Sequence, residues 1–224
     1  AGARAAHARL SASLDAVTDD VARRPSLLPD WTVGHLLTHL ARNADGITGI
    51  FEAAAEGRVA DQYPGGQEQR RADIEAGAHR PAAELVADVR DAAARLERTW
   101  QATPDAAWAR GTGRTARGEL GLAEIVFRRW REVEVHHADL GLDVTWRDWS
   151  TEYVDLELDR QLNALAPRLP DDLALRVEAT DALGVWIVET VPRPPVVIRA
   201  PRHELVAWLL GRVSRPDWPE LAPW

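Results

Sequence analysis

The residues of this chain whose types and spacing best suit metal chemistry are Glu132 and His136, in the stretch REVEVHH. They lie four positions apart, so a helix places both side chains on one face. A carboxylate oxygen and an imidazole nitrogen on one face can bind the same divalent metal ion. Trp130 and Val133 indicate that much of this helix is buried, where a glutamate is costly unless it is paired or ligates a metal. A hydrogen-bonded Glu–His pair without a metal is the alternative for these two residues.

Two further histidines, His35 and His39, also lie four positions apart, in the stretch WTVGHLLTHLARN. Leucines surround His39, so we expect it at or near the core side of a helix. Taken alone, either histidine is better explained as a buried residue bonded to a backbone carbonyl. Together with Glu132 and His136 they gain a second interpretation, because metal sites in helical bundles are built from side chains on facing helices.

Two histidines and one carboxylate leave a tetrahedral zinc ion with an open position, which is the pattern of catalytic rather than structural zinc sites. Nitrogen and oxygen donors also suit nickel, cobalt and manganese, so the ligand types alone do not select zinc. The spacing does not decide whether His35 or His39 is the ligand.

Helices must position these residues, and hydrophobic periodicity predicts four of them in the first part of the chain. Their expected ranges are about 3–20, 30–55, 81–100 and 119–140, with Asp30 as the N-cap of the second and Pro81 at the start of the third. The polar stretch 58–80 is expected to be a long loop with a short helix, of the kind that often serves as a lid. GTGRTARG, before the fourth helix, is expected to be a flexible connection, with an anion site at the helix N-terminus as the alternative.

After Gly141 the sequence changes character, and its pattern predicts a small α+β unit. We expect a helix over about 151–165, strands in LALRVEA, VWIVET and VVIRA, and a final helix over about 203–211. The predicted fold is therefore α+β: a four-helix bundle over residues 1–145, followed by a small α+β domain over residues 146–224.

Composition excludes several classes of function. The chain has 224 residues and no cysteine, which removes disulfides, cysteine-ligated metals and a cysteine nucleophile, so any thiol must come from outside. A net charge of -8 argues against a nucleic-acid partner. No apolar run approaches the ~20 residues that span a bilayer, and no stretch resembles a signal peptide, so we expect no membrane partner and a cytoplasmic location. The sequence does not specify an oligomeric state.

Two motifs carry a family resemblance. WTVGHLLTHLARNADG, followed later in the chain by RRWREVEVHHADLG, resembles the mycothiol-dependent maleylpyruvate isomerase family, which belongs to the DinB-like group of metal-binding four-helix bundles. The resemblance extends over nearly the whole chain, including LLGR near its end. It implies that His39, Glu132 and His136 are the zinc ligands, with His35 and His137 as fallback ligands.

The resemblance also implies the chemistry. The external thiol that it implies is mycothiol. A thiol bound to Zn²⁺ loses its proton readily, because the metal stabilises the thiolate. Its thiolate would add to the cis double bond of a maleylpyruvate-like substrate, and rotation followed by expulsion of the thiol would leave the trans isomer. Arg212, in the C-terminal GR pair, would bind the carboxylate of this small substrate, with a contact to a helix dipole as its structural alternative. We expect the active site to lie where the bundle meets the α+β domain, which would complete it.

Two other functions fit the same residues. A mycothiol S-transferase would use an identical metal site but would consume the thiol on another electrophile. A non-catalytic DinB-like metal-binding module would instead close the site with a fourth protein ligand such as His35.

Overall fold

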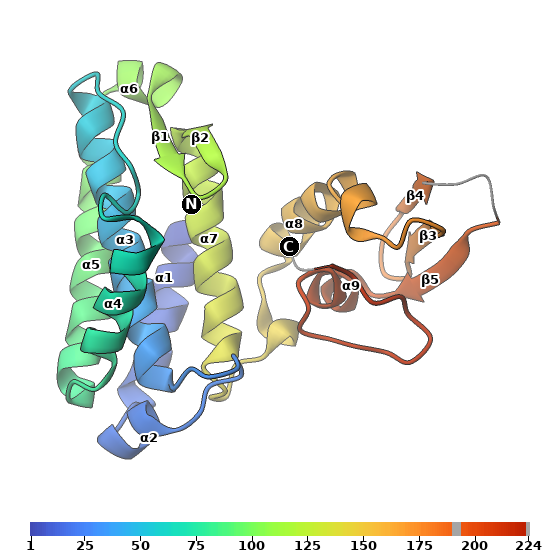
Figure 1. The fold of residues 1–224 in the computed structure, drawn as a ribbon, viewed down its shortest axis with the longest axis horizontal. Coiled ribbons are helices and arrows are strands. Elements are labelled where there is room, and N and C mark those ends of the chain that lie inside the picture. The colour runs from blue at the N-terminus through green and yellow to red at the C-terminus, as the bar shows by residue number, and fades with distance from the viewer. Residues whose placement is uncertain (190–193, 223–224) are drawn as a thin grey trace. The chain divides into compact units, whose positions relative to one another are not determined.

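A bundle of four helices makes up most of the first of the two units into which the chain divides, Ala1–Asp143 and Val144–Trp224 (Figure 1). The computed structural model describes residues 1–189 and 194–222. The four helices are α1 (Gly2–Ser13), α3 (Val33–Ala55), α5 (Ala82–Ala102) and α7 (Leu122–Asp139). The predicted α+β fold with a helical bundle in its N-terminal part is confirmed.

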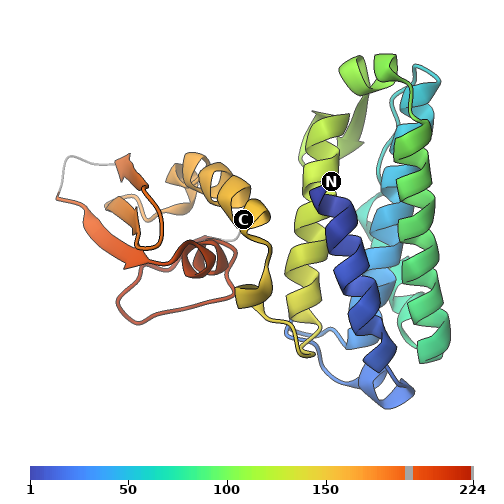
Figure 2. The same ribbon diagram turned by 180° about the vertical axis from the view of Figure 1, so that it is seen from behind.

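The helices of the bundle run in pairs. Helices α1 and α7 point one way, and α3 and α5 point the other (Figures 1 and 2). Two consecutive long helices can run parallel only if the chain returns between them, and helix α4 (Gly66–Ala78) makes that return alongside α3. Residues 58–80 were predicted to be a long loop with a short helix, and the helix instead takes up most of that stretch. Only Ile74 and Ala78 of α4 are buried, so its apolar stripe is too sparse to detect by periodicity.

The start of α3 is fixed by Thr32 rather than by Asp30. The hydroxyl of Thr32 accepts the backbone N–H of His35, and Nδ1 of His35 accepts the backbone N–H of Thr32, which makes a reciprocal cap. The prediction of Asp30 as N-cap was wrong because Asp30 adopts a left-handed conformation, with φ of 64°, in the preceding turn. The cap fixes the helical phase of both His35 and His39.

The first predicted helix is shorter than expected. Helix α1 ends at Ser13 and is followed by a 3₁₀ turn, Leu14–Ala16, and then by α2 (Asp19–Arg23). The break occurs because the Thr18 side chain accepts the backbone N–H of Val21 and begins a new helix.

The glycine-rich connection before α7 is ordered as a hairpin. Helix α6 (Asp105–Arg110) leads into β1 (Thr112–Thr115), which pairs antiparallel with β2 (Gly118–Gly121). The predicted flexible connection was therefore wrong, and α7 begins at Leu122 instead of at 119. It ends as predicted just before Gly141, which has a φ of 66° that an L side chain rarely adopts.

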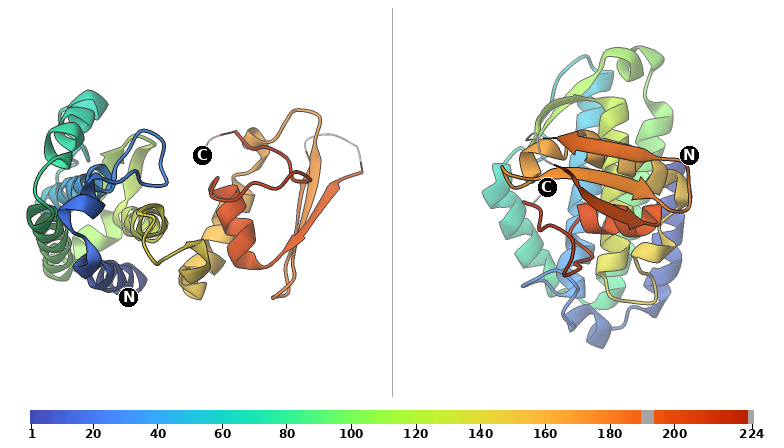
Figure 3. Two further views of the ribbon diagram at one scale, coloured as in Figure 1. Left: turned by 90° about the horizontal axis from the view of Figure 1, so that it is seen from below. Right: turned by 90° about the vertical axis from the view of Figure 1, so that its right-hand side faces the viewer.

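The second unit contains a three-stranded sheet in the order β4-β3-β5. A 3₁₀ turn (Trp146–Asp148), α8 (Thr151–Asn163) and another 3₁₀ turn (Ala166–Arg168) precede the strands, which are β3 (Ala174–Ala179), β4 (Val185–Glu189) and β5 (Val196–Ala200). Strand β3 pairs antiparallel with β4 and parallel with β5, and α9 (Arg202–Leu209) follows. Figure 3 shows α8 and α9 on the same side of this sheet. Thr190, the last residue of a predicted strand, lies outside the described residues.

Helix α3 is the centre of the first unit. Leucines at 36, 37 and 40 are fully buried, and α3 packs against α4, α5 and α7. Within the described ranges, no helix combines the length and the apolar character needed to cross a bilayer.

Candidate metal centre

Helices α3 and α7 bring His39, Glu132 and His136 together. Nε2 of His39 lies 2.8 Å from Oε2 of Glu132, and Nε2 of His136 lies 3.4 Å from the same oxygen. The two imidazole rings meet edge to face, with their centroids 5.0 Å apart. Two nitrogen donors and one oxygen donor thus converge on one point between the helices.

The cluster is buried on the α3 side and opens at the carboxylate. The exposed fraction of the side chain is 4% for His39, 13% for His136 and 27% for Glu132. Trp31 covers His39, with ring centroids 5.5 Å apart. Among the described residues, no fourth histidine or carboxylate lies close enough to join the group. A metal held here would keep an open position, which is the arrangement of catalytic zinc sites.

The three groups have strongly shifted proton affinities. Burial lowers the pKa of His39 to about 4, against the opposing hydrogen bond to Glu132. Burial alone would raise the pKa of Glu132, but hydrogen bonds from His136 and His39 hold it well below its usual range. Burial also opposes a charge on His136, yet the hydrogen bonds to Asp139 and Glu132 raise its pKa to about 9. At neutral pH the cluster therefore contains a neutral His39, an ionised Glu132 and a protonated His136, and a divalent cation that displaces the proton of His136 would compensate the carboxylate in its place.

Asp139 orients His136 from outside the cluster. Nδ1 of His136 donates to Oδ2 of Asp139 at 2.9 Å, and Asp139 is 1% exposed. This bond keeps Nε2 facing Glu132, so that Nε2 presents its lone pair there once a metal has displaced its proton. Metal-binding histidines commonly have such a carboxylate on their second nitrogen, which fixes the tautomer and the ring plane.

Arg70, on α4, contacts the other histidine. Its Nη2 donates to Nδ1 of His39 at 3.0 Å, and its guanidinium lies over the Tyr63 ring, 5.4 Å from the centroid. Because a guanidinium can only donate, the proton of neutral His39 is on Nε2 in this arrangement. Arg70 was not predicted as a site residue, because the stretch 58–80 was interpreted as a long loop with only a short helix. Asp139 was not predicted either, although its spacing of three residues from His136 on a helix was a usable signal.

The two fallback histidines have other partners. Nε2 of His137 lies 2.8 Å from the hydroxyl of Ser13 on α1, so this side chain belongs to the α1–α7 contact. His35 caps α3 through Thr32 and forms a separate group with Glu75 and His79. Neither lies in the cluster of His39, Glu132 and His136.

Arg212 lies in the second unit, directly after α9. Its backbone N–H bonds the carbonyl of Ala207 and that of Gly211 bonds Trp208, an arrangement in which Gly211, with φ of 72°, ends the helix. One guanidinium nitrogen of Arg212 donates to the carbonyl of Leu210 at 2.6 Å, as expected for a cation at a helix C-terminus. Arg212 also lines a pocket of about 640 Å³, together with two other arginines, at positions 168 and 215.

Comparison with known sequences identifies a family for the first unit. The profile of the family described as "Mycothiol maleylpyruvate isomerase N-terminal domain" matches residues 3–141, which contain all three residues of the cluster. No curated protein matches the chain.

Two solved structures have the same fold. The crystal structure of a mycothiol-dependent maleylpyruvate isomerase matches with a TM-score of 0.90 and 24% sequence identity, covering 100% of this chain and 94% of that chain. A histidine-to-alanine mutant of a mycothiol-dependent maleylpyruvate isomerase matches with a TM-score of 0.89 and 23% identity, with the same coverage. At this level of identity the likeness establishes the fold of both units.

Proposed function

Because the chain belongs to the mycothiol maleylpyruvate isomerase N-terminal domain family, we propose that it is a metal- and mycothiol-dependent cis–trans isomerase of a small maleylpyruvate-like acid. The observation that carries this proposal is the convergence of His39, Glu132 and His136 inside the matched domain. Their two nitrogens and one carboxylate fit a zinc ion with an open position, and zinc is the metal we propose.

Different residues of the chain would bind the metal, position a ligand and exclude water. His39, Glu132 and His136 would hold the metal, and the metal would lower the pKa of a bound thiol so that it reacts as a thiolate at neutral pH. Asp139 would keep Nε2 of His136 aimed at the metal through the bond to Nδ1. Trp31 would exclude water from the His39 side of the site. Isomerisation returns the thiol, because only the geometry of a carbon–carbon double bond differs between substrate and product.

We further propose that Arg212, in the second unit, binds the substrate carboxylate. The pocket that Arg212 lines is rich in arginine, and a guanidinium fork matches a carboxylate with two parallel hydrogen bonds. A lysine at this position keeps the charge but cannot form that fork. Arg212→Lys should therefore lower kcat/KM by about tenfold or more, the scale of one charged hydrogen bond, and leave the metal content intact. Unchanged kinetics would remove Arg212 from the proposed site.

The first experiment is elemental analysis of the dialysed protein and of His39→Ala. We expect one tightly held zinc ion per chain in the wild type and its loss in the variant, because His39 supplies one of only three protein ligands. His203→Ala, which removes a histidine from the second unit, is the matched control and should keep the metal. A folded wild type that takes up no zinc would overturn the proposal.

The second experiment follows the thiol. Zinc-loaded protein is mixed with mycothiol and maleylpyruvate, and both the trans product and the free thiol are measured over time. An isomerase forms product while the thiol concentration stays constant. A thiol concentration that falls in step with the substrate would identify an S-transferase instead. If protein that holds its metal neither forms the trans product nor consumes the thiol, the proposed substrate class is contradicted.

A further inference from the structure

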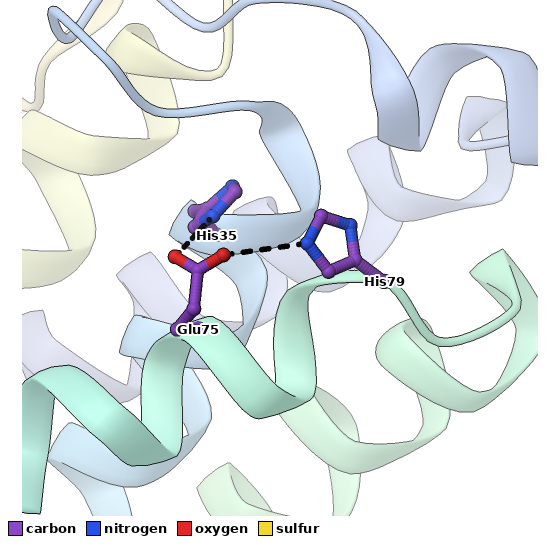
Figure 4. Close-up of side chains that lie close together, drawn as sticks. All are labelled: His35, Glu75 and His79. Atoms are coloured by element: carbon purple, nitrogen blue, oxygen red, sulfur yellow. Dashed lines mark hydrogen bonds and ion pairs between the residues drawn. The ribbon is translucent and has the colours of Figure 1, made fainter.

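A second group of metal-binding side chains lies one turn away along α3. His35 on α3 faces Glu75 near the end of α4 and His79, which ends that helix. Nε2 of His35 lies 3.2 Å from Oε2 of Glu75, and Nε2 of His79 lies 3.4 Å from Oε1 of the same carboxylate. Figure 4 shows the carboxylate of Glu75 between the two imidazole rings, with one contact to each.

The distances suit a metal ion. Zinc–nitrogen and zinc–oxygen bonds of about 2.0–2.1 Å place the ligand atoms of a tetrahedral site roughly 3.3 Å apart. The two contacts to Glu75 are close to this length, although each histidine contacts a different carboxylate oxygen, and one ligand atom from each residue lies within 4.8 Å of the other two. The His79 side chain is exposed, so it can rotate toward a shared oxygen when a metal binds. The donor set also repeats that of the first cluster: a histidine of α3 with a glutamate and a histidine four positions apart on a neighbouring helix.

The backbone holds the two helices where this group requires them. A side chain at Gly34 would meet the carbonyl oxygen of Ala78 at 2.2 Å, and one at Gly77 would meet Cγ2 of Thr38 at 2.5 Å. Both positions therefore need glycine for α3 and α4 to approach this closely. These two contacts between α3 and α4 lie on either side of His35 along α3, so they hold the last turn of α4 next to His35.

One ligand of the group is preorganised, and the other two can adapt. The His35 side chain is 9% exposed, and its Nδ1 lies 2.7 Å from the hydroxyl of Thr32, which holds the ring with Nε2 toward Glu75. A metal on Nε2 requires the ring proton on Nδ1, where it is donated to this hydroxyl in place of the bond that Nδ1 accepts from the Thr32 N–H. The side chains of Glu75 and His79 are each 70% exposed, so water can fill the remaining coordination positions. Contacts with His35 and then His79 lower the pKa of Glu75, which keeps the carboxylate ionised as a metal requires.

We propose that His35, Glu75 and His79 form a second site for a divalent cation of the zinc, cobalt and nickel class, separate from the cluster of His39, Glu132 and His136. Imidazole nitrogens with one carboxylate select these borderline cations over calcium and magnesium, which prefer oxygen ligands. The second site binds more weakly than the first, because ordering two exposed side chains costs conformational entropy. An ion bound there links the end of α4 to the start of α3, and α4 carries Arg70, which contacts His39.

The test is a calorimetric titration of chelator-stripped protein with Zn²⁺ alone. The wild type should bind two ions per chain, the second at least tenfold more weakly than the first. His79→Ala should lose the weaker event and keep the tighter one, and Glu75→Gln should weaken it at least tenfold. Glu68→Gln, which makes the same charge change on an exposed residue of α4, is the matched control and should retain both events.

The same titration distinguishes failure of this second site from failure of the proposed active site. His39→Ala should lose the tighter event and keep the weaker one, so each site succeeds or fails by itself. Far-UV circular dichroism of every variant confirms that the helices are intact. A wild type that binds a single ion, or a second event that persists unchanged in both His79→Ala and Glu75→Gln, would overturn the second site and leave the first unaffected.

Discussion

Asp139 offers a sharp test of how the first cluster is held. Its buried carboxylate accepts the Nδ1 proton of His136 at 2.9 Å, and that bond aims Nε2 at Glu132. Asp139→Asn keeps the size of the side chain but removes its charge. The amide can also present a donor to Nδ1, which favours the tautomer whose proton sits on Nε2. Metal binding then has to move the ring proton to Nδ1 and break that bond, whereas in the wild type the bond from Nδ1 to Asp139 persists when Nε2 gives up its proton to the metal.

The magnitude follows from two independent ranges. A hydrogen bond to a charged group contributes about 1.5–3 kcal/mol. Loss of the outer partner of a metal-binding histidine typically lowers metal affinity about 10–100-fold, which corresponds to roughly 1.4–2.7 kcal/mol. The ranges agree, so we expect the Kd for zinc in the tighter site to rise by about 10–100-fold in Asp139→Asn.

Competition with a chromophoric zinc chelator measures this Kd directly. Asp91→Asn is the matched control, because it makes the same chemical change on an exposed position of α5. Asp139 is buried, so circular dichroism and a melting curve must first establish that the variant is folded at the assay temperature. A folded Asp139→Asn whose zinc Kd stays within threefold of the wild type would refute the argument that this carboxylate positions His136.

Two further predictions concern the neighbouring helices. Arg70→Ala should tighten zinc binding about two- to tenfold, which is the scale of one hydrogen bond. Arg70 can donate to Nδ1 of His39 only when the ring proton is on Nε2, the nitrogen proposed to bind the metal, so this hydrogen bond opposes metal binding. Weaker zinc binding by the variant in the chelator assay would contradict this. His7 is buried, it accepts from Nε of Arg129 at 3.0 Å, and burial followed by the charge of Arg129 lowers its pKa from 6.5 to about 2. Because only the unfolded chain gains a proton at His7 between these values, its contribution is nearly complete one pH unit above 6.5 and falls by about 1.4 kcal/mol for each pH unit well below 6.5. Urea unfolding of metal-free protein at pH 6.5 and 5.5 should therefore show a loss of stability larger by about 1 kcal/mol in the wild type than in His7→Gln, because half of the unfolded chains already carry this proton at pH 6.5. Equal losses in the two proteins would contradict a neutral His7.

The sequence by itself determined the family, the fold class and the main helices of the bundle. The apolar stripes of α3, α5 and α7 are long enough to be recognised from periodicity, because each of these helices buries a continuous face. The spacing of four residues also placed Glu132 and His136 on one helix face, since that follows from helix geometry alone.

Local interactions between polar groups and the backbone were harder to predict. Thr32 rather than Asp30 caps α3, and Thr18 ends the first helical stretch early, because several residues near each boundary could serve as caps. The stretch 58–80 was interpreted as a long loop with only a short helix because α4 buries little apolar surface. Its position depends on close backbone contact at Gly34 and Gly77, which no hydrophobic pattern encodes.

Only the tertiary structure decided how the histidines are grouped. His35 and His39 occupy the same face of α3 one turn apart, so their sequence positions are nearly equivalent. Because α7 packs beside His39, His39 contacts Glu132, and because α4 packs beside His35, His35 contacts Glu75. Which neighbour each histidine meets depends on contacts between residues distant in sequence. Helical spacing can therefore propose ligand pairs along one helix, but the third ligand is fixed by how the helices pack.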